Sequence, residues 1–338
     1  MNIKRQHTQT ANDQTFKSKR TVNLIDALER KALLSLVVEP AGSCNLTCSF
    51  CDLHSGRLQD VEQYKGIMTF KIFKTLVDQL SRQHFKLKEM QLHGNGEPLL
   101  NKQLEKFVSY AKEKNVAERI RITTNGTMLT EKRFVGLVAA GADEIRISAD
   151  VADIDAYEKF KGKNLFKKLD KNIKFSIDYV NKNENISLVI KYPVTNDQSS
   201  TQYGVDDTFE KSIHEQYASR ITSSKILLSA MPVQTQMDGV ILYKKKVSKP
   251  CELPFYSLFV KFDGRVSACC ADVTNVFNFG NILDGEKEFE NILHGEELRG
   301  LRRKHIQKNL QDVPICNFCS VRTVTDMEGH ADEILLLI

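Results

Sequence analysis

Short apolar runs alternate with amphipathic stretches along most of the chain, beginning near residue 33. The apolar runs predict strands at residues 33–40, 89–94, 119–126, 144–150, 186–192 and 224–230. Helical periodicity predicts helices near residues 69–83, 102–114, 130–140, 166–182 and 205–219. This alternation is typical of a parallel sheet with crossover helices. Six units are fewer than the eight of a closed barrel, so we expect an α/β fold with a partial barrel or an open sheet.

Polar and glycine-containing segments follow four of the predicted strands. They are CNLTCSFC (44–51), GNGEP (94–98), TTNG (123–126) and SAD (148–150). Ligand sites of parallel α/β folds lie at the edge formed by the carboxyl ends of the strands. We therefore expect these four segments to converge on one cavity.

The alternation stops within residues 231–250, and a different pattern follows. Residues 258–270 alternate around Asp263-Gly264, which is a hairpin turn signal, and helices are expected at about 286–293 and 295–308. The predicted parts are a polar, disordered extension (1–32), a core (33–232), a linker (233–250), a small α+β domain (251–325) and a tail (326–338).

The composition narrows the range of functions. Hydrophobic residues make up 41% of the 338 residues, which is enough for a large core. The net charge is +5, but the first twenty residues carry most of it, so no extended basic groove for nucleic acid is expected. No segment has the roughly 18 consecutive apolar residues of a membrane helix, and a cytoplasmic location is expected.

The cysteines stand in close clusters, which favours metal binding in a reducing compartment over disulfides. Cys44, Cys48 and Cys51 have the spacing C-x3-C-x2-C and are one ligand short of a structural zinc site. Three thiolates on a 4Fe-4S cube would leave the fourth iron open for a small molecule. The spacing alone leaves two alternatives, a zinc loop completed by His54 or three inert thiols.

This loop resembles the signature of the radical S-adenosylmethionine (SAM) superfamily. The resemblance covers about residues 33–325 and implies a partial (β/α)6 TIM-like barrel. It also implies that SAM binds the open iron of the cluster. Cleavage of SAM would then give a 5′-deoxyadenosyl radical that abstracts hydrogen from a substrate.

The segment 94–98 is similar to the Gly-Gly-Glu segment that holds the methionyl part of SAM in the family. Asn95 replaces a glycine, whereas Gly94, Gly96 and Glu97 keep the family spacing. Glycines allow a backbone to approach a ligand closely, and a carboxylate can accept an ammonium group. Taken alone, the segment could be a turn before the next helix.

The resemblance implies further contacts with SAM. Phe50 occupies the aromatic position that lies beside the adenine in the family. Asn125, Ser148 and Asp150 correspond to polar groups that contact the ribose and the methionine carboxylate. Without the resemblance, Phe50 could belong to the core, and such polar residues commonly cap helices.

The second group of cysteines supplies a complete ligand set, Cys251, Cys269, Cys316 and Cys319. Their pattern, C-x12-G-x4-C followed by C-x2-C, resembles the SPASM and twitch domains of radical SAM enzymes and implies an auxiliary 4Fe-4S cluster. Two further SPASM cysteines are replaced here by Thr325 and Gly329, so the twitch form with one auxiliary cluster is the better match. Zinc is the alternative for four cysteines alone.

Cys270 is left over from both ligand sets. It could be an inert buried thiol, an alternative ligand to Cys269, or a hydrogen-atom donor to a substrate radical.

A fully ligated auxiliary cluster has no free iron for substrate, so its simplest use is electron transfer. Twitch enzymes of similar spacing include an alcohol dehydrogenase of an aminocyclitol pathway. The resemblance therefore implies a two-electron oxidation of an alcohol or sugar-like molecule. An external donor such as flavodoxin or ferredoxin would reduce the SAM cluster.

Two other functions stay open. A peptide maturase that forms thioethers, inverts residues or oxidises side chains would use the same machinery. The 32 residues before the first strand are too few and too polar for a leader-binding module, which favours a small molecule or carbohydrate over a peptide. A zinc-stabilised scaffold without activity is the alternative outside enzymes.

Overall fold

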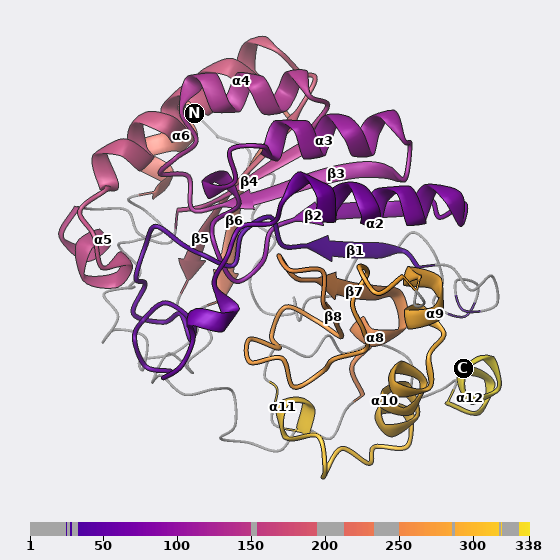
Figure 1. Cartoon of the computed structure of the whole chain (residues 1–338). Helices are drawn as coiled ribbons and strands as arrows, with labels where there is room; N and C mark the ends of the chain where they lie inside the picture. The colour runs from indigo at the N-terminus through magenta and orange to yellow at the C-terminus, as the bar shows by residue number, and fades with distance from the viewer. Residues whose placement is uncertain are drawn as a thin grey trace.

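Eight strands form a single open sheet (Figure 1). They are β1 (Ser35–Val38), β2 (Leu87–Leu92), β3 (Ala117–Thr124), β4 (Glu144–Ser148), β5 (Ser187–Val194), β6 (Ile226–Pro232), β7 (Ser257–Val260) and β8 (Val266–Ser267). Their order is β6-β5-β4-β3-β2-β1-β7-β8, with parallel pairing from β6 to β7 and an antiparallel β7–β8 hairpin. The six predicted core strands and the partial barrel are therefore confirmed.

The computed structural model describes the greater part of the chain. The described residues are 25, 28, 33–149, 154–194, 213–232, 250–285, 288–317, 319 and 331–338. Most of the predicted extension, most of the predicted linker, Asp150 and the first part of the helix expected at 205–219 lie outside them. The domain limits inferred from the sequence stay a prediction.

The helices agree with most of the expected pattern. The α-helices are α2 (Phe70–Arg82), α3 (Leu104–Glu113), α4 (Glu131–Ala139), α5 (Ile154–Lys161), α6 (Phe166–Lys182), α8 (Leu253–Tyr256), α9 (Phe289–Leu293), α10 (Glu296–Ile306), α11 (Pro314–Asn317) and α12 (Ala331–Leu337). Short 3-10 helices are η1 (Glu62–Tyr64), η2 (Pro98–Leu100) and η4 (Ala218–Arg220). The sequence did not predict α5, α8, α11 or α12.

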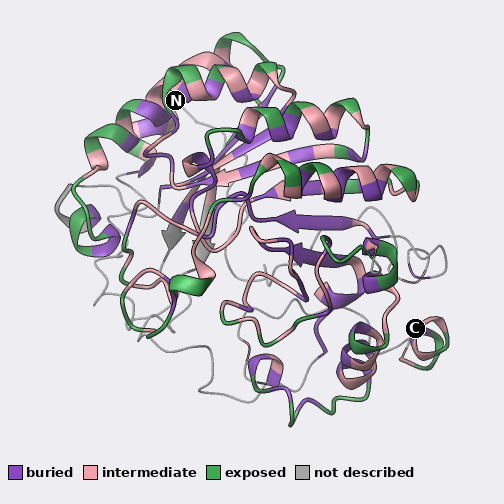
Figure 2. Cartoon of the chain, viewed as in Figure 1, coloured by how far each residue is buried: buried purple, intermediate pink, exposed green. Residues whose placement is uncertain are grey.

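Helices α2, α3, α4 and α6 cover one face of the sheet (Figure 1). Strands β2, β3 and β4 alternate apolar and polar residues, so one side of each is buried under these helices, as with Met90, Ile120 and Ile145. Figure 2 shows buried residues along the strands and on the sheet-facing sides of the helices. The other face of the sheet carries polar and charged side chains and forms the lumen of the partial barrel.

The C-terminal hairpin extends the core sheet. Strand β7 pairs with β1 in parallel, from Ser35 opposite Ser257 to Val38 opposite Val260. The turn between β7 and β8 contains Gly264 at φ +91°, which confirms the predicted hairpin. Between the two parts of the chain, the Gln79 side chain donates to the Ile282 carbonyl and accepts from the Phe289 amide.

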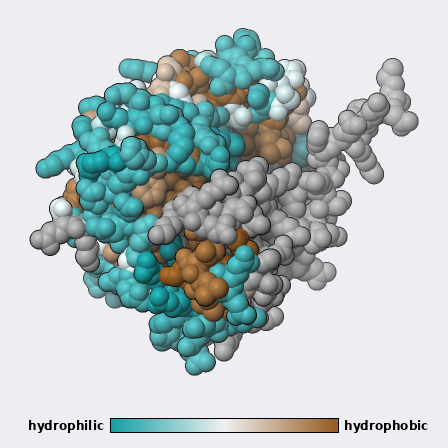
Figure 3. All heavy atoms as spheres, turned by 90° about the vertical axis from the view of Figure 1, so that its right-hand side faces the viewer, coloured by the Kyte–Doolittle hydropathy of each residue, from teal (hydrophilic) through white to brown (hydrophobic). Residues whose placement is uncertain are grey.

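The last helix, α12, packs on the C-terminal domain. Its Ile334 is buried in a small second core with Leu28, Phe255 and Ile306, whereas Leu336 is 88% exposed. Figure 3 shows separate hydrophobic patches on an otherwise hydrophilic face of the molecule. None of the helices in the described ranges is long and apolar enough to span a membrane.

Candidate functional site

The three-cysteine loop leaves the carboxyl end of β1 and is fastened to the end of α5. The Thr47 amide donates to the Lys161 carbonyl at 3.2 Å, and the Ser49 amide donates to the Phe160 carbonyl at 2.8 Å. Gly162, at φ +71°, brings the chain against Thr47. Helix α5 therefore supports the cysteine loop.

The thiols of Cys44 and Cys51 are partly buried and are weak acids there. Burial raises the pKa of Cys44 to about 11 and also raises the pKa of Cys51. The charge of Glu97 opposes ionisation of Cys44 further, whereas Lys161 favours it. Without added positive charge these thiols stay protonated at neutral pH. Irons of a cluster would supply that charge and convert the thiols to thiolates, so the donor set fits an iron–sulfur cluster.

Glu97 is 1% exposed and ties the GNGEP segment to the end of β3. One carboxylate oxygen accepts from the Leu99 amide at 3.0 Å and from the Thr124 hydroxyl at 2.6 Å, and the other accepts from the Asn125 amide at 2.8 Å. A carboxylate has about four acceptor positions. One therefore remains for a ligand such as the SAM ammonium group.

The glycines of GNGEP lie close to other parts of the chain, Gly96 to the backbone and Gly94 to a side chain. A Cβ atom on Gly96 would lie 2.2 Å from the Ser43 carbonyl oxygen. One on Gly94 would lie 2.5 Å from Cγ of Glu39. These positions need glycine so that the segment can lie against the cysteine loop. The Glu97 amide also donates to the Ser43 carbonyl at 2.9 Å.

The TTNG turn contacts the cysteine loop as well. The Asn125 amide side chain donates to Oδ1 of Asn45 at 2.9 Å, and the Asn45 side chain donates to the Thr127 hydroxyl at 2.9 Å. His54 Nε2 lies 3.1 Å from the Asn95 carbonyl oxygen and donates to it. Three of the four polar segments thus meet at one sheet edge, as the strand order predicted.

The other predicted SAM contacts have different positions. Ser148 ends β4 and lies opposite Lys191 of β5. The Lys161 ammonium lies 5.2 Å from the centre of the Phe50 ring, a cation–π arrangement. The contacts predicted for Phe50, Ser148 and Asp150 stay predictions.

The C-terminal cysteines line one cavity of about 500 Å³, part of which is open to solvent. Its lining includes Cys251, Cys269, Cys270, Cys316 and Cys319, together with apolar side chains such as Leu253, Phe277 and Ile315. Burial raises the pKa of Cys269, and its thiol neighbours raise it further. Four thiols around one apolar cavity fit an auxiliary cluster, which would supply the positive charge they need.

Cys270 is a fifth cysteine in the lining of the auxiliary cavity. Burial raises the pKa of its thiol. The charges of Cys319 and Glu39 oppose its ionisation, whereas the charge of Lys191 favours it. Cys270 therefore lies within electrostatic reach of both the auxiliary cysteines and the lumen residues.

Glu39 is a site residue that the sequence analysis missed. It is 2% exposed, and its carboxylate accepts from the Asn95 amide at 2.8 Å and from the Phe262 amide at 3.3 Å. It thus joins the GNGEP segment to the C-terminal hairpin. A glutamate in an apolar strand directly before the cysteine loop was the available signal.

Comparison with known proteins identifies both regions. Residues 38–199 match the radical SAM superfamily, and residues 251–320 match an iron–sulfur cluster-binding domain, SPASM. An S-adenosyl-L-methionine-dependent 2-deoxy-scyllo-inosamine dehydrogenase of Niallia circulans is 25% identical over 300 residues, 88% of this chain and 97% of the relative. A probable GTP 3′,8-cyclase of Methanococcus maripaludis is 31% identical over 135 residues, 40% of this chain and 42% of the relative.

Solved structures share the fold. BtrN in complex with AdoMet and 2-DOIA has a TM-score of 0.54 and 21% identity, covering 85% of this chain and 92% of BtrN. The anSMEcpe protein with bound AdoMet has a TM-score of 0.58 and 14% identity, covering 90% and 92%. The chain therefore contains a radical SAM domain followed by a SPASM/twitch iron–sulfur domain, and these domains imply SAM and two iron–sulfur clusters as its cofactors.

Proposed function

We propose that the chain oxidises an alcohol or sugar-like small molecule by two electrons. The similarity to a dehydrogenase over 97% of that relative's length supports this reaction. The observation that carries it is the apolar cavity lined by the C-terminal cysteines, which gives the chain a place for a second electron acceptor. When bound, the cofactors would supply a radical that takes hydrogen from the substrate and an acceptor for the second electron.

The chain's own residues bind and orient the cofactors in this proposal. Cys44, Cys48 and Cys51 hold the SAM cluster, and the four C-terminal ligands hold the auxiliary one. Glu97 accepts the SAM ammonium with its remaining acceptor position. Phe50, Ser148 and Asp150 contact the adenosine and carboxylate parts, and Asn125 holds the cysteine loop beside them.

This chemistry needs an electron donor and a reducing compartment. Flavodoxin or ferredoxin is the proposed electron donor. The clustered spacing of the cysteines favours metal ligation over disulfides, and a reducing cytoplasm would keep such thiols available for iron.

Anaerobic reconstitution tests the proposal. About eight irons per chain are expected from two cubes, and SAM should be cleaved to 5′-deoxyadenosine. The triple variant C44A/C48A/C51A should retain about four irons and lose SAM cleavage. Stoichiometric zinc without bound iron would contradict the proposal.

The auxiliary ligands give the second half of the test. The double variant C316A/C319A should keep SAM cleavage but lose oxidised product, because the second electron has no acceptor. Oxidation that persists in this variant would show that the auxiliary cavity is not the electron acceptor site.

A further inference from the structure

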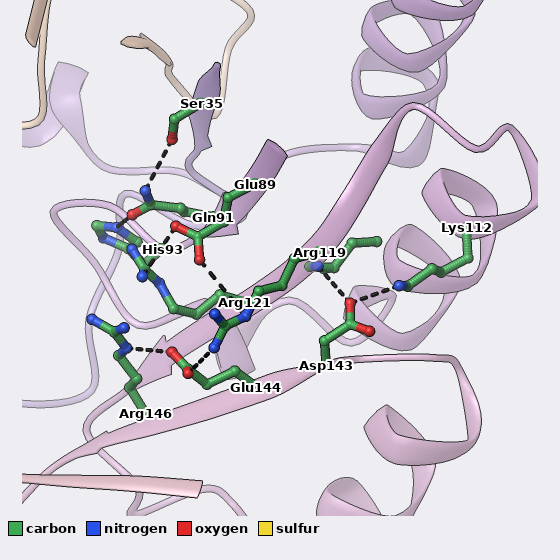
Figure 4. A network of polar contacts seen from close by, with 11 residues as sticks. Ser35, Glu89, Gln91, His93, Lys112, Arg119, Arg121, Asp143, Glu144 and Arg146 are labelled. Carbon is green, nitrogen blue, oxygen red and sulfur yellow. Dashed lines mark hydrogen bonds and ion pairs between the residues drawn. The ribbon is translucent and has the colours of Figure 1, made fainter. Parts of the chain in front are cut away.

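The lumen face of the sheet carries an unusual number of charged side chains for a parallel sheet. Gln91, Arg121 and Glu144 are register partners across β2, β3 and β4, and Thr123 lies opposite Arg146. Figure 4 shows Gln91, Arg121, Glu144 and Arg146 with some of their neighbours. Parallel sheets with two covered faces have near-continuous apolar strands. A polar lumen face therefore indicates a polar occupant.

Cations outnumber carboxylates on this part of the lumen face. The cations are Arg119, Arg121, Arg146 and Lys191, and the carboxylates are Glu89 and Glu144. Arg121 Nη1 lies 3.0 Å from Glu89 Oε2, whereas Glu144 is shared by Arg119 and Arg146. Among the residues that the structure describes, these two carboxylates thus pair with three guanidinium groups.

The guanidinium group of Arg121 is incompletely satisfied. Its side chain is 14% exposed, and its buried Nε–H has no hydrogen-bond acceptor within the described part of the chain. Burial, with the nearby charge of Arg146 adding to it, lowers the pKa of Arg121 to about 10. A buried cation without full compensation is costly, so an added negative group would stabilise it.

The cations converge near the edge of the sheet that carries the SAM segments. His93, directly after β2 and before GNGEP, is influenced by Arg121, Lys191 and Arg146 together. His93 donates from Nε2 to Gln91 Oε1 at 3.2 Å and is neutral, so it adds no further positive charge. The surplus of positive charge therefore lies below the proposed SAM site.

We propose that the substrate carries an acidic group, a phosphate or a carboxylate, that binds between Arg121 and Arg146. This rests on the proposed function and specifies its substrate class. Guanidinium groups bind both kinds of oxyanion in bidentate fashion. The same cations would repel an amine, so the substrate differs in charge from the inosamine named for the similar dehydrogenase.

Lys191 is left out of the core of this proposal because it lies opposite Ser148, a predicted SAM contact. Arg146 lies two residues before Ser148 on the same face of β4. It is therefore farther from the carboxyl edge of the sheet than Ser148. The two arginines are therefore placed for substrate rather than for the SAM carboxylate.

Calorimetric titration of the reconstituted, SAM-loaded enzyme tests the proposal, with inorganic phosphate, acetate and neutral myo-inositol as probes. One of the two anions should bind saturably, and the stronger one identifies phosphate or carboxylate as the group. Arg121→Gln and Arg146→Gln should each weaken anion binding at least tenfold. Arg146→Lys should recover part of the affinity because it restores the charge.

Arg303→Gln is the matched control, because Arg303 pairs with Glu296 on α10 and is 41% exposed. It should bind the anion as the wild type does. Saturable binding of neither anion would overturn the proposal. Unchanged anion binding in both Arg121→Gln and Arg146→Gln would also overturn it. The same holds if these two variants lose affinity for SAM but keep their affinity for the anion.

Iron content and SAM cleavage are measured on the same samples. Absence of iron or of 5′-deoxyadenosine in the wild type would refute the proposed function. Anion binding is read without turnover, so the two failures are distinguishable. Variants that keep about eight irons have kept their fold.

Discussion

Glu97 accepts three hydrogen bonds while it is almost fully buried, so it holds the fold as well as a proposed cofactor position. Glu97→Gln replaces one carboxylate oxygen by an NH2 group. That NH2 group would point at an N–H or O–H donor that now hydrogen-bonds to the carboxylate, so this hydrogen bond would be lost. We expect the free energy of unfolding to fall by about 1–3 kcal/mol. Urea unfolding measures the change, and Glu113→Gln, at an exposed position, should leave stability unchanged. Equal stability of both variants would contradict this role.

His93 gives the molecule a specific pH dependence. Burial and three nearby cations lower its pKa from 6.5 to about 3. The unfolded chain therefore binds one more proton than the folded chain between these pH values, and stability falls as the pH is lowered through that window. At pH 5 the loss should be about 2 kcal/mol.

Unfolding at pH 7.5 and pH 5.0 measures this effect. His93→Gln should lose most of the difference because it removes the titrating group. A substitution of the exposed His84 by Gln should retain it. If His93→Gln keeps the full wild-type pH dependence, another group is responsible.

At the residue level, the sequence identified side chains that belong to short motifs. The cysteines and Glu97 could be found because their spacing is local. Glu39 and the lumen arginines could not be assigned in this way, because their partners come from distant strands. The alternation in RIRITT and EIRIS was a usable signal, since it places arginines on one face of a parallel strand.

At the level of elements, the contact between the GNGEP segment and the cysteine loop depends on Gly96. In Gly96→Ala the new Cβ atom would meet the backbone carbonyl oxygens of Ser43 and Ala41 at 2.2 and 2.4 Å. Backbone atoms cannot move aside as flexible side chains do. We therefore expect the cysteine loop to be displaced and the SAM cluster to be lost.

Iron analysis and SAM cleavage check this expectation. Gly96→Ala should retain about four irons, those of the auxiliary cluster, and cleave no SAM. Gly300→Ala is the control, because nothing lies within 4 Å of the added atom and the site is helical. Full iron content in Gly96→Ala would show that the close approach is not essential.

The amphipathic core helices were predicted because their apolar spacing is regular, and α2 and α4 begin at Thr69 and Thr130, whose hydroxyls cap them. Helix α5 was missed because it directly follows the SAD segment. Its Tyr157 and Phe160, three positions apart and buried, carried the helical signal. The short helices α8 and α11 have too few residues for a periodic pattern.

At the scale of the whole molecule, the sequence predicted two parts but not how they join. The pairing of β7 with β1 brings together segments more than 200 residues apart. No local pattern in either strand names its partner, because both are short apolar runs. The joint depends on tertiary contacts such as Gln79 with Ile282 and Phe289.

The same pairing determines what happens when the C-terminal part is removed. Without residues 251–338, β1 would become an edge strand whose backbone N–H and C=O groups face solvent. Such edges recruit strands from other molecules. Light scattering should therefore show that a chain ending at residue 250 self-associates as its concentration rises, and a monomeric truncated chain would contradict this. The iron–sulfur domain thus also protects the edge of the catalytic sheet from aggregation.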